Sequence, residues 1–367
     1  MAWIRAIYRV RSTVREIETV ALMLALEQSV EVPATVVTDP FVAEHIMGKV
    51  ASITPLDDST FRVEVLLATQ TTGFETAQTL NMLFGNSSLH EHIELTSVEF
   101  PPDYLAHFPG PRYGIAKIRD LVHAHDRPLT CAALKPQGLS TEKLAELAYT
   151  FAAGGIDVIK DDHGLASQSY SPFVERVNAC QQAINRANRV TGHHAVYAPS
   201  LVGSPSSLID QARIVHETGT QMVMICPSLV GPALFEELVR TTLKVPVLAH
   251  PAFGGAARIS PPLLIGALYR LWGADGVIFP NFGGRFSYSA QTCHEIADHA
   301  RKTLGSMPRA FPVPAGGLSV DRVPELVSFY GQDVMLLIGG SLLAAGNALP
   351  DRVKEFVQAA AQAASSN

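Results

Sequence analysis

Residues 155–164, Gly-Ile-Asp-Val-Ile-Lys-Asp-Asp-His-Gly, decide how this sequence folds. Their apolar first half is typical of a buried β-strand, and the closing glycine marks a turn. Because side chains alternate along a strand, Lys160 and Asp162 share one face, whereas Asp161 points to the other. Charges at the end of a buried strand are unfavourable unless they are paired or bind a metal. This stretch therefore predicts a functional site, with a Lys160–Asp162 ion pair as the structural alternative.

Seven further apolar runs repeat this pattern and alternate with helical stretches. Strands buried on both faces read as unbroken apolar runs, and each needs a crossover helix before its parallel neighbour. Eight such units over about 240 residues predict a (β/α)8 barrel, and a doubly wound open sheet is the alternative. The predicted strands are 129–134, 156–159, 195–201, 222–229, 245–249, 276–279, 310–313 and 334–338.

The first hundred residues mix strands and helices differently, which suggests a sheet with helices on one side. Prolines at 101–102 and 109–111 mark a boundary. We therefore expect an α/β protein with a ferredoxin-like α+β domain over residues 1–105 and the barrel over 106–367. In the first domain the sequence predicts strands over 2–11, 61–67 and 92–98, a helix over 75–84, and a helix over 15–27 whose apolar face includes Leu22, Met23 and Leu26.

Composition limits the partners of this chain. It has 367 residues, 47% of them hydrophobic, and a net charge of −6, which gives no basic footprint for nucleic acid. No apolar run approaches the ~20 residues of a membrane span, and the N-terminus lacks a signal-peptide core. Four cysteines without CxxC spacing fit reduced thiols. We expect a cytoplasmic protein with neither nucleic acid nor membrane as partner.

Polar and glycine-rich segments follow the predicted strands, where the active sites of such barrels lie. Lys135 follows the first strand and could act as a general base or contact phosphate. His250 ends the fifth strand and faces the mouth unless it is a core histidine. The pairs Gly316-Gly317 and Gly339-Gly340 follow the last two strands. Glycine amides at a helix N-terminus bind phosphate, so these pairs predict a phosphate site, with tight turns as the alternative.

These segments together resemble ribulose bisphosphate carboxylase/oxygenase (RuBisCO). Residues 154–162 resemble the family signature, whose lysine is carbamylated and binds Mg²⁺, and residues 134–140 resemble its catalytic-lysine loop, shortened by one residue. The phosphate loops and N-terminal landmarks in residues 27–39, 85–86 and 108–115 extend the likeness to the whole chain. The chain is identified as similar to the type IV, non-carboxylating RuBisCO-like proteins.

The resemblance implies a ligand set, a catalytic set and a dimer. One Mg²⁺ per subunit would be held by carbamylated Lys160, Asp162 and His163. The family has a carboxylate where His163 stands, so another divalent metal is the alternative. Lys135, Lys160 and His250 would be catalytic. The substrate-binding set would comprise Glu27 and Asn86, reaching the site from the partner of a homodimer, with Arg285, Gly316, Gly317, Gly339 and Gly340.

Departures from the family pattern concern one end of the substrate. Pro251, Phe279 and Ala315 stand where the family has an arginine, a histidine and a serine for a second phosphate, and Val32 replaces a phosphate-binding threonine. A second phosphate would lose its charge partners here, whereas an apolar tail would gain about 0.8 kcal/mol per buried methylene. The sequence therefore predicts a sugar monophosphate with an apolar tail against a wall that also includes Phe253, Pro280 and Phe282.

Methylthio-pentulose phosphates of methionine salvage, substrates known for RuBisCO-like proteins, fit this description. We expect an isomerase of 5-methylthioribulose 1-phosphate that uses a 1,3-proton shift through a metal-bound enediolate and fixes no CO2. Either a carbamate oxygen or Lys135 would be the base. The alternatives are a 2,3-diketo-5-methylthiopentyl 1-phosphate enolase, a decarboxylase of a phosphorylated 3-oxo sugar acid, and a regulatory protein that has lost catalysis.

Overall fold

The computed structural model describes residues 2–365, which divide into two compact units. Of the described residues, one unit comprises 2–108 and 254–264, and the other comprises 109–253 and 265–365. The short segment 254–264 thus belongs with the N-terminal unit, although it follows a barrel strand in sequence. Within that unit Ser260 N donates to the carbonyl of Leu95 over 2.9 Å and so extends the sheet edge.

The N-terminal unit is built on an antiparallel sheet in the order β2-β3-β1-β4. Its strands are β1 (Trp3–Arg11), β2 (Lys49–Pro55), β3 (Thr60–Ala68) and β4 (Ile93–Glu99), and its helices are α1 (Ile17–Glu27), α2 (Thr76–Phe84) and α3 (Pro102–Leu105). The sequence did not predict β2. The expectation for α1 was wrong in its face, because Leu22 and Met23 are exposed while Ala21, Leu24 and Ala25 are buried.

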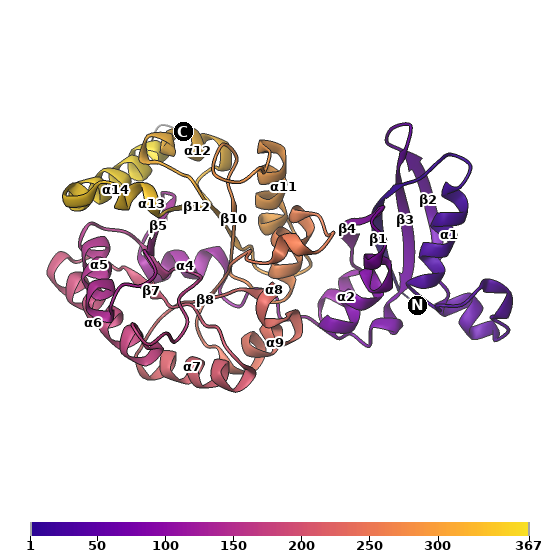
Figure 1. Ribbon diagram of the computed structural model, residues 1–367, viewed down its shortest axis with the longest axis horizontal. Helices are drawn as coiled ribbons and strands as arrows, with labels where there is room; N and C mark the ends of the chain where they lie inside the picture. The colour runs from indigo at the N-terminus through magenta and orange to yellow at the C-terminus, as the bar shows by residue number, and fades with distance from the viewer. Residues whose placement is uncertain (1, 366–367) are drawn as a thin grey trace. The chain divides into compact units, whose positions relative to one another are not determined.

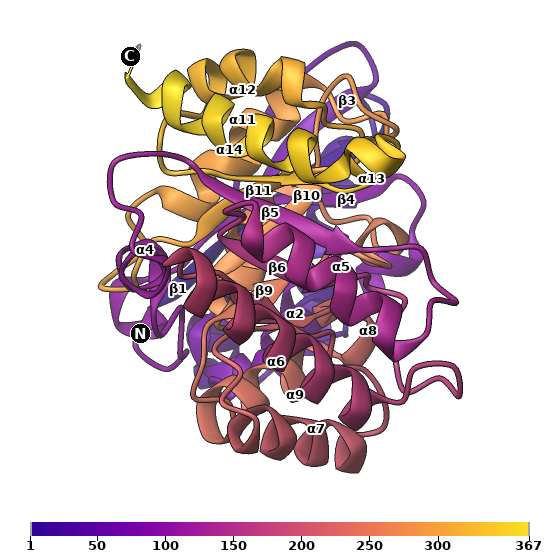
Figure 2. The same ribbon diagram turned by 90° about the vertical axis from the view of Figure 1, so that its left-hand side faces the viewer.

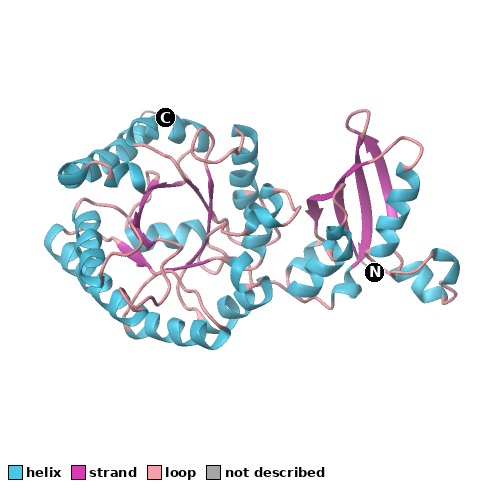
Figure 3. Ribbon diagram, in the orientation of Figure 1, coloured by secondary structure: helices cyan, strands magenta, loops and turns pink. Residues whose placement is uncertain are grey.

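The second unit is the predicted (β/α)8 barrel, with an inner ring of strands and helices outside it (Figure 3). Two parallel four-stranded sheets, β11-β10-β9-β8 and β12-β5-β6-β7, make up the ring. A parallel bridge between Ser200 and Met224 joins β7 to β8, and the pairing of β12 with β5 returns the last strand to the first. The strands are β5 (Leu129–Leu134), β6 (Val158–Asp161), β7 (Val196–Ala198), β8 (Val223–Ile225), β9 (Val247–Ala249), β10 (Gly276–Pro280), β11 (Phe311–Ala315) and β12 (Met335–Ile338).

Helices surround this ring, and several of them pack side by side. The long helices α5 and α6 run side by side, as do α12 and α14 (Figure 1 and Figure 2). The helices are α4 (Gly114–Val122), α5 (Thr141–Ala153), α6 (Phe173–Thr191), α7 (Pro205–Glu217), α8 (Pro227–Val230), α9 (Pro232–Glu237), α10 (Tyr269–Leu271), α11 (Ala290–Arg301), α12 (Val323–Tyr330), α13 (Gly340–Leu343) and α14 (Leu349–Ser365).

The barrel core takes every second residue of each strand, as alternation requires. Cys131 and Ala133 of β5, for example, lie in the same buried cluster as Val313 of β11. Ile118 and Val122 of α4 join that cluster, so α4 packs under the barrel interior. The predicted strands 195–201 and 222–229 were too long. Strand β7 ends at Ala198, and β8 ends at Ile225 because Pro227 begins the short helix α8.

Candidate active site

The carboxyl ends of β5, β6 and β9 bring together five predicted side chains. Lys135 follows β5, Lys160 lies in β6 with Asp162 and His163 just beyond it, and His250 follows β9. The Lys135 ammonium forms an ion pair with Asp162. The imidazole of His163 lies 3.1 Å from the other oxygen of that carboxylate. The rings of His163 and His250 stack, with centroids 4.2 Å apart and planes inclined by 11°.

Lys160 is buried, with 3% of its surface exposed. Its Nζ donates to the backbone carbonyl of Asp161 over 2.6 Å. The alternative expected from the sequence, an ion pair of Lys160 with Asp162, is therefore not what forms, because Asp162 pairs with Lys135 instead. Burial lowers the pKa of Lys160, which favours the uncharged amine. An uncharged amine is a nucleophile that can react with CO2, as carbamylation requires.

Asp162 keeps its charge in this buried setting. Burial by itself raises the pKa of a carboxyl group, but hydrogen bonds from His163 and Lys135 and from the Gly164 amide together hold the pKa of Asp162 well below its usual range. The Gly164 amide donates to Asp162 Oδ1 over 2.9 Å. The site therefore contains one firmly ionised carboxylate at the end of β6.

His250 is held in its neutral form. Burial is the main cause that lowers the pKa of His250 to about 2. The amide of Ala252 donates to His250 Nδ1 over 3.2 Å. Since Nδ1 accepts this bond, the hydrogen of the neutral ring is on Nε2. The donor hydrogen of His250 is therefore on Nε2, in a ring that stacks on His163.

Asp161 points away from the barrel interior, as the alternation predicts. Its carboxylate accepts hydrogen bonds from the Tyr197 hydroxyl at 2.6 Å and from Arg176 Nε and the Ser200 amide at 3.1 Å each. Sequence reasoning did not identify Arg176 or Tyr197. The available signal was the position of Arg176, at helical spacing from the apolar residues Phe173 and Cys180.

The glycine pairs have different environments. Gly316 and Gly317 have φ of +83° and +108°, which a residue with a side chain rarely adopts. A Cβ on Gly317 would lie 2.9 Å from Gly284 Cα, so the loop after β10 packs directly on this pair. Gly339 precedes α13, and a Cβ there would lie 3.8 Å from the Lys135 side chain. Gly340 begins α13, with open space beside it.

Arg285 lies in the loop that packs on Gly316. Its amide donates to the Gly316 carbonyl over 2.9 Å, and its exposed guanidinium lies 5.4 Å from the centroid of the Phe286 ring. The structure therefore brings Arg285 beside one predicted glycine pair.

The expected apolar wall is smaller than the sequence suggested. Phe279 was placed in it wrongly: Ile278 belongs to the barrel core, so Phe279 faces the opposite side, where its ring contacts Tyr330 of α12. Phe282 packs on Phe329 of the same helix. Ala315 does pack against the barrel core. Pro280 lies two residues after Ile278 in β10, so both are on the strand face that points to the barrel interior.

Glu27 and Asn86 meet within the N-terminal unit. Asn86 Nδ2 donates to Glu27 Oε1 over 2.8 Å and to Glu31 Oε1 over 3.0 Å. Glu27 is the last residue of α1, and Asn86 follows α2. The two predicted residues thus form one polar group, to which Glu31 adds a second carboxylate.

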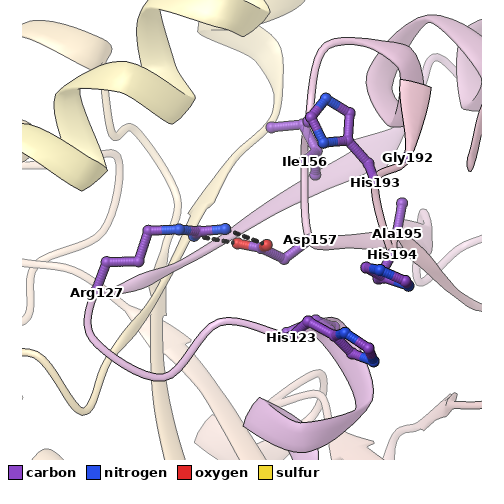
Figure 4. A pocket seen from close by; sticks show the side chains of 10 residues that line it. His123, Arg127, Ile156, Asp157, Gly192, His193, His194 and Ala195 are labelled. Atoms are coloured by element: carbon purple, nitrogen blue, oxygen red, sulfur yellow. Dashed lines mark hydrogen bonds and ion pairs between the residues drawn. The ribbon is translucent and has the colours of Figure 1, made fainter.

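A polar cavity of about 220 Å³ lies at the opposite, amino end of the barrel strands (Figure 4). Arg127 and Asp157 both line it and form an ion pair with two 2.7 Å contacts, and Thr130 donates twice to the same carboxylate. His123 and His194 stack at its rim with centroids 3.7 Å apart. Because Asp157 is fully engaged in joining the starts of β5 and β6, we assign this ion pair a structural role.

The donors at the end of β6 fit a divalent metal only if Lys160 contributes. Within residues 2–365, no group of three or more His, Cys, Asp and Glu side chains converges on a metal position. Asp162 and His163 supply two donors, and the buried Lys160 amine on the same strand face is suited to become the third as a carbamate. The residues present therefore fit a carbamate-assisted metal site.

Comparison with known proteins agrees with this arrangement. Residues 114–348 match the family described as ribulose bisphosphate carboxylase large chain, catalytic domain. The chain is 48% identical over 349 residues to ribulose bisphosphate carboxylase-like protein 1 of Rhodopseudomonas palustris, covering 95% of each. It is 46% identical over 363 residues to the 5-methylthioribulose-1-phosphate isomerase of Rhodospirillum rubrum, covering 99% of this chain and 97% of the other.

A solved structure shares the whole fold. The crystal structure of a Rubisco-like protein from Rhodopseudomonas palustris superposes with a TM-score of 0.92 at 44% identity, covering 99% of this chain and 98% of the other. With a matching catalytic-domain model and relatives that span its full length, this chain belongs to the ribulose bisphosphate carboxylase large-chain family, as a RuBisCO-like protein.

Proposed function

We propose that this protein is an isomerase of 5-methylthioribulose 1-phosphate that acts in methionine salvage in the cytoplasm and does not fix CO2. The observation that carries the proposal is the 46% identity over nearly the full chain to a protein named for that activity. The clustered Lys135, Lys160, Asp162, His163 and His250 support it, because they provide a buried amine, a carboxylate and imidazoles at the barrel mouth.

The proposed cofactor is one Mg²⁺ per subunit, or another divalent metal, held by carbamylated Lys160, Asp162 and His163. When bound, it would supply a Lewis acid that makes a proton next to a carbonyl easier to remove. Two oxygen donors suit Mg²⁺, and the imidazole of His163 admits softer metals.

The chain's own residues then bind the substrate and move protons. Backbone amides at Gly316, Gly317, Gly339 and Gly340 would hold the phosphate, with Arg285 beside the first pair. Lys135, once its amine is uncharged, would take the proton from carbon and return it to a second carbon, which balances an isomerisation. His250, whose neutral ring carries its hydrogen on Nε2, would hold or pass a hydroxyl proton. Pro280 and Ala315 would receive the methylthio end of the substrate.

We also propose a homodimer with shared active sites. Glu27 and Asn86 would reach the site of the partner subunit, and the exposed Leu22 and Met23 of α1 would be covered on association. Sedimentation should give a mass of twice the 39.4 kDa monomer at micromolar concentration. A stable monomer with full activity would contradict the shared site.

The direct test of the activity uses purified protein, Mg²⁺, bicarbonate and 5-methylthioribulose 1-phosphate in D2O. Phosphorus and proton NMR should show a new methylthio-pentulose phosphate that carries deuterium on carbon. If this substrate is not converted and CO2 is released from a phosphorylated 3-oxo sugar acid, the protein is a decarboxylase instead. Turnover of only 2,3-diketo-5-methylthiopentyl 1-phosphate would assign an enolase.

A further inference from the structure

We infer that Lys135 occupies the cation position of the active site before a metal binds, so that metal binding and the release of Lys135 are one coupled event. The inference rests on the proposed metal site, and it assigns to Lys135 a second role beyond proton transfer. It makes the catalytic lysine available only in subunits that already hold metal.

The contacts of Asp162 carry this inference. One carboxylate oxygen receives the Lys135 ammonium, and the other receives His163 Nδ1 and the Gly164 amide. The Asp162 side chain is 8% exposed, so both of its oxygens are engaged inside the protein. A divalent cation can therefore take the oxygen bound to Lys135 only when that ammonium leaves.

Lys135 is also the lysine that is free to leave. Lys160 is held inside the barrel by its bond to the Asp161 carbonyl, whereas the Lys135 side chain is 35% exposed to solvent. The stem of Lys135 passes beside Gly339, which has no side chain to obstruct it. Once released from Asp162, the amine can stay at the barrel mouth beside a proposed phosphate loop.

Removal of the Lys135 charge should strengthen metal binding. In a Lys135→Met variant the metal no longer competes with an ammonium for Asp162, nor is it repelled by that charge. For a partly exposed competitor we expect the metal dissociation constant to fall roughly five- to tenfold. A lysine that acts only in proton transfer predicts no change, and one that helps to build the metal site predicts weaker binding.

The experiment is a titration of the full-length protein with Mn²⁺ in saturating bicarbonate, with free Mn²⁺ followed by electron paramagnetic resonance. Lys135→Met should bind Mn²⁺ five- to tenfold more tightly than the native protein. Lys135→Arg, which keeps the competing cation, and Lys143→Met, which removes an exposed lysine on α5, should stay within twofold. Equal or weaker binding by Lys135→Met overturns the inference.

A measurement on the native protein covers the case in which Lys135→Met does not fold. Reductive methylation followed by peptide mass spectrometry reports the exposure of each lysine. Labelling of Lys135 should become at least threefold faster when Mn²⁺ and bicarbonate are present, and unchanged or slower labelling overturns the inference. Neither measurement uses turnover, so loss of the isomerase assignment would leave this result standing, and the reverse also holds.

Discussion

Arg176 and Asp161 form an ion pair in which both side chains are fully buried, with Nε 3.1 Å from Oδ2. The Tyr197 hydroxyl and the Ser200 amide bond the same carboxylate, so α6, β7 and the segment after β7 are all joined to the end of β6. Lys160 and Asp162 flank Asp161 in the chain. This buried pair lies on the outer face of the strand ring, between the strands and the helices. It therefore fixes the position of the proposed catalytic side chains on the inner face.

Replacement of Arg176 should be strongly destabilising. Arg176→Met leaves the Asp161 carboxylate buried without its counter-ion, and breaking a buried pair in this way costs about 3–5 kcal/mol of unfolding free energy. Urea denaturation followed by circular dichroism measures the loss. Arg189→Met, an exposed change at the end of the same helix, is the control and should change stability by less than about 0.5 kcal/mol. Similar effects of the two substitutions would remove the positioning role of the pair.

Lys160→Met should abolish both Mn²⁺ binding and isomerase turnover. The variant keeps most of the buried side-chain volume but has no amine to carbamylate, so the third metal donor is lost. We expect turnover to fall on the order of a thousandfold or more, as when a main electrostatic group is removed from an active site. Calorimetric Mn²⁺ titration and NMR assays check the two effects. Retained metal binding would exclude the carbamate from the ligand set.

Gly317→Ala should impair phosphate binding more than Gly340→Ala. The first substitution puts a side chain at φ +108° and 2.9 Å from Gly284, whereas the second adds a methyl group in open space. We expect Gly317→Ala to lower stability by about 1–3 kcal/mol and to raise KM for the sugar phosphate. Thermal unfolding and steady-state kinetics measure these changes. If Gly340→Ala raises KM equally, the strain explanation is wrong.

The stability of the barrel should depend on pH through Asp275. Burial raises the pKa of this carboxyl to about 6, against the lowering effect of hydrogen bonds from the amides of Gly114, Val247 and Tyr113. The folded protein thus binds the proton more tightly than the unfolded chain, whose carboxyl titrates near pH 4. Its contribution is present below pH 4 and is lost as the pH rises to about 6, by roughly 3 kcal/mol.

An Asp275→Asn variant isolates this contribution. Asparagine does not titrate, so the unfolding free energy of the variant should lack that decline between pH 4 and pH 6. Urea unfolding at half-unit pH steps gives the difference between the two proteins. Parallel pH profiles would show that Asp275 titrates alike in the folded and unfolded states.

Much of the barrel could be predicted because its local signals agree with its tertiary structure. Ser140, for example, is the N-cap of α5, and its hydroxyl accepts a hydrogen bond from the Lys143 amide. Strand β2 was missed, because residues 49–55 lie on a sheet edge with little burial and no apolar run. The face of α1 was wrong for a related reason, since apolar residues encircle that helix and only packing selects which are covered.

The sequence by itself determined the alternation of strands and helices and the arrival of Lys135, Lys160, Asp162 and His250 at strand ends, because hydrophobic periodicity and strand parity are local properties. Only the tertiary structure decided which of these groups pair. In the folded protein Asp162 pairs with Lys135 rather than with Lys160, and the Phe279 ring contacts Tyr330. Such choices depend on distances between strands far apart in the chain, and no pattern within one strand records them.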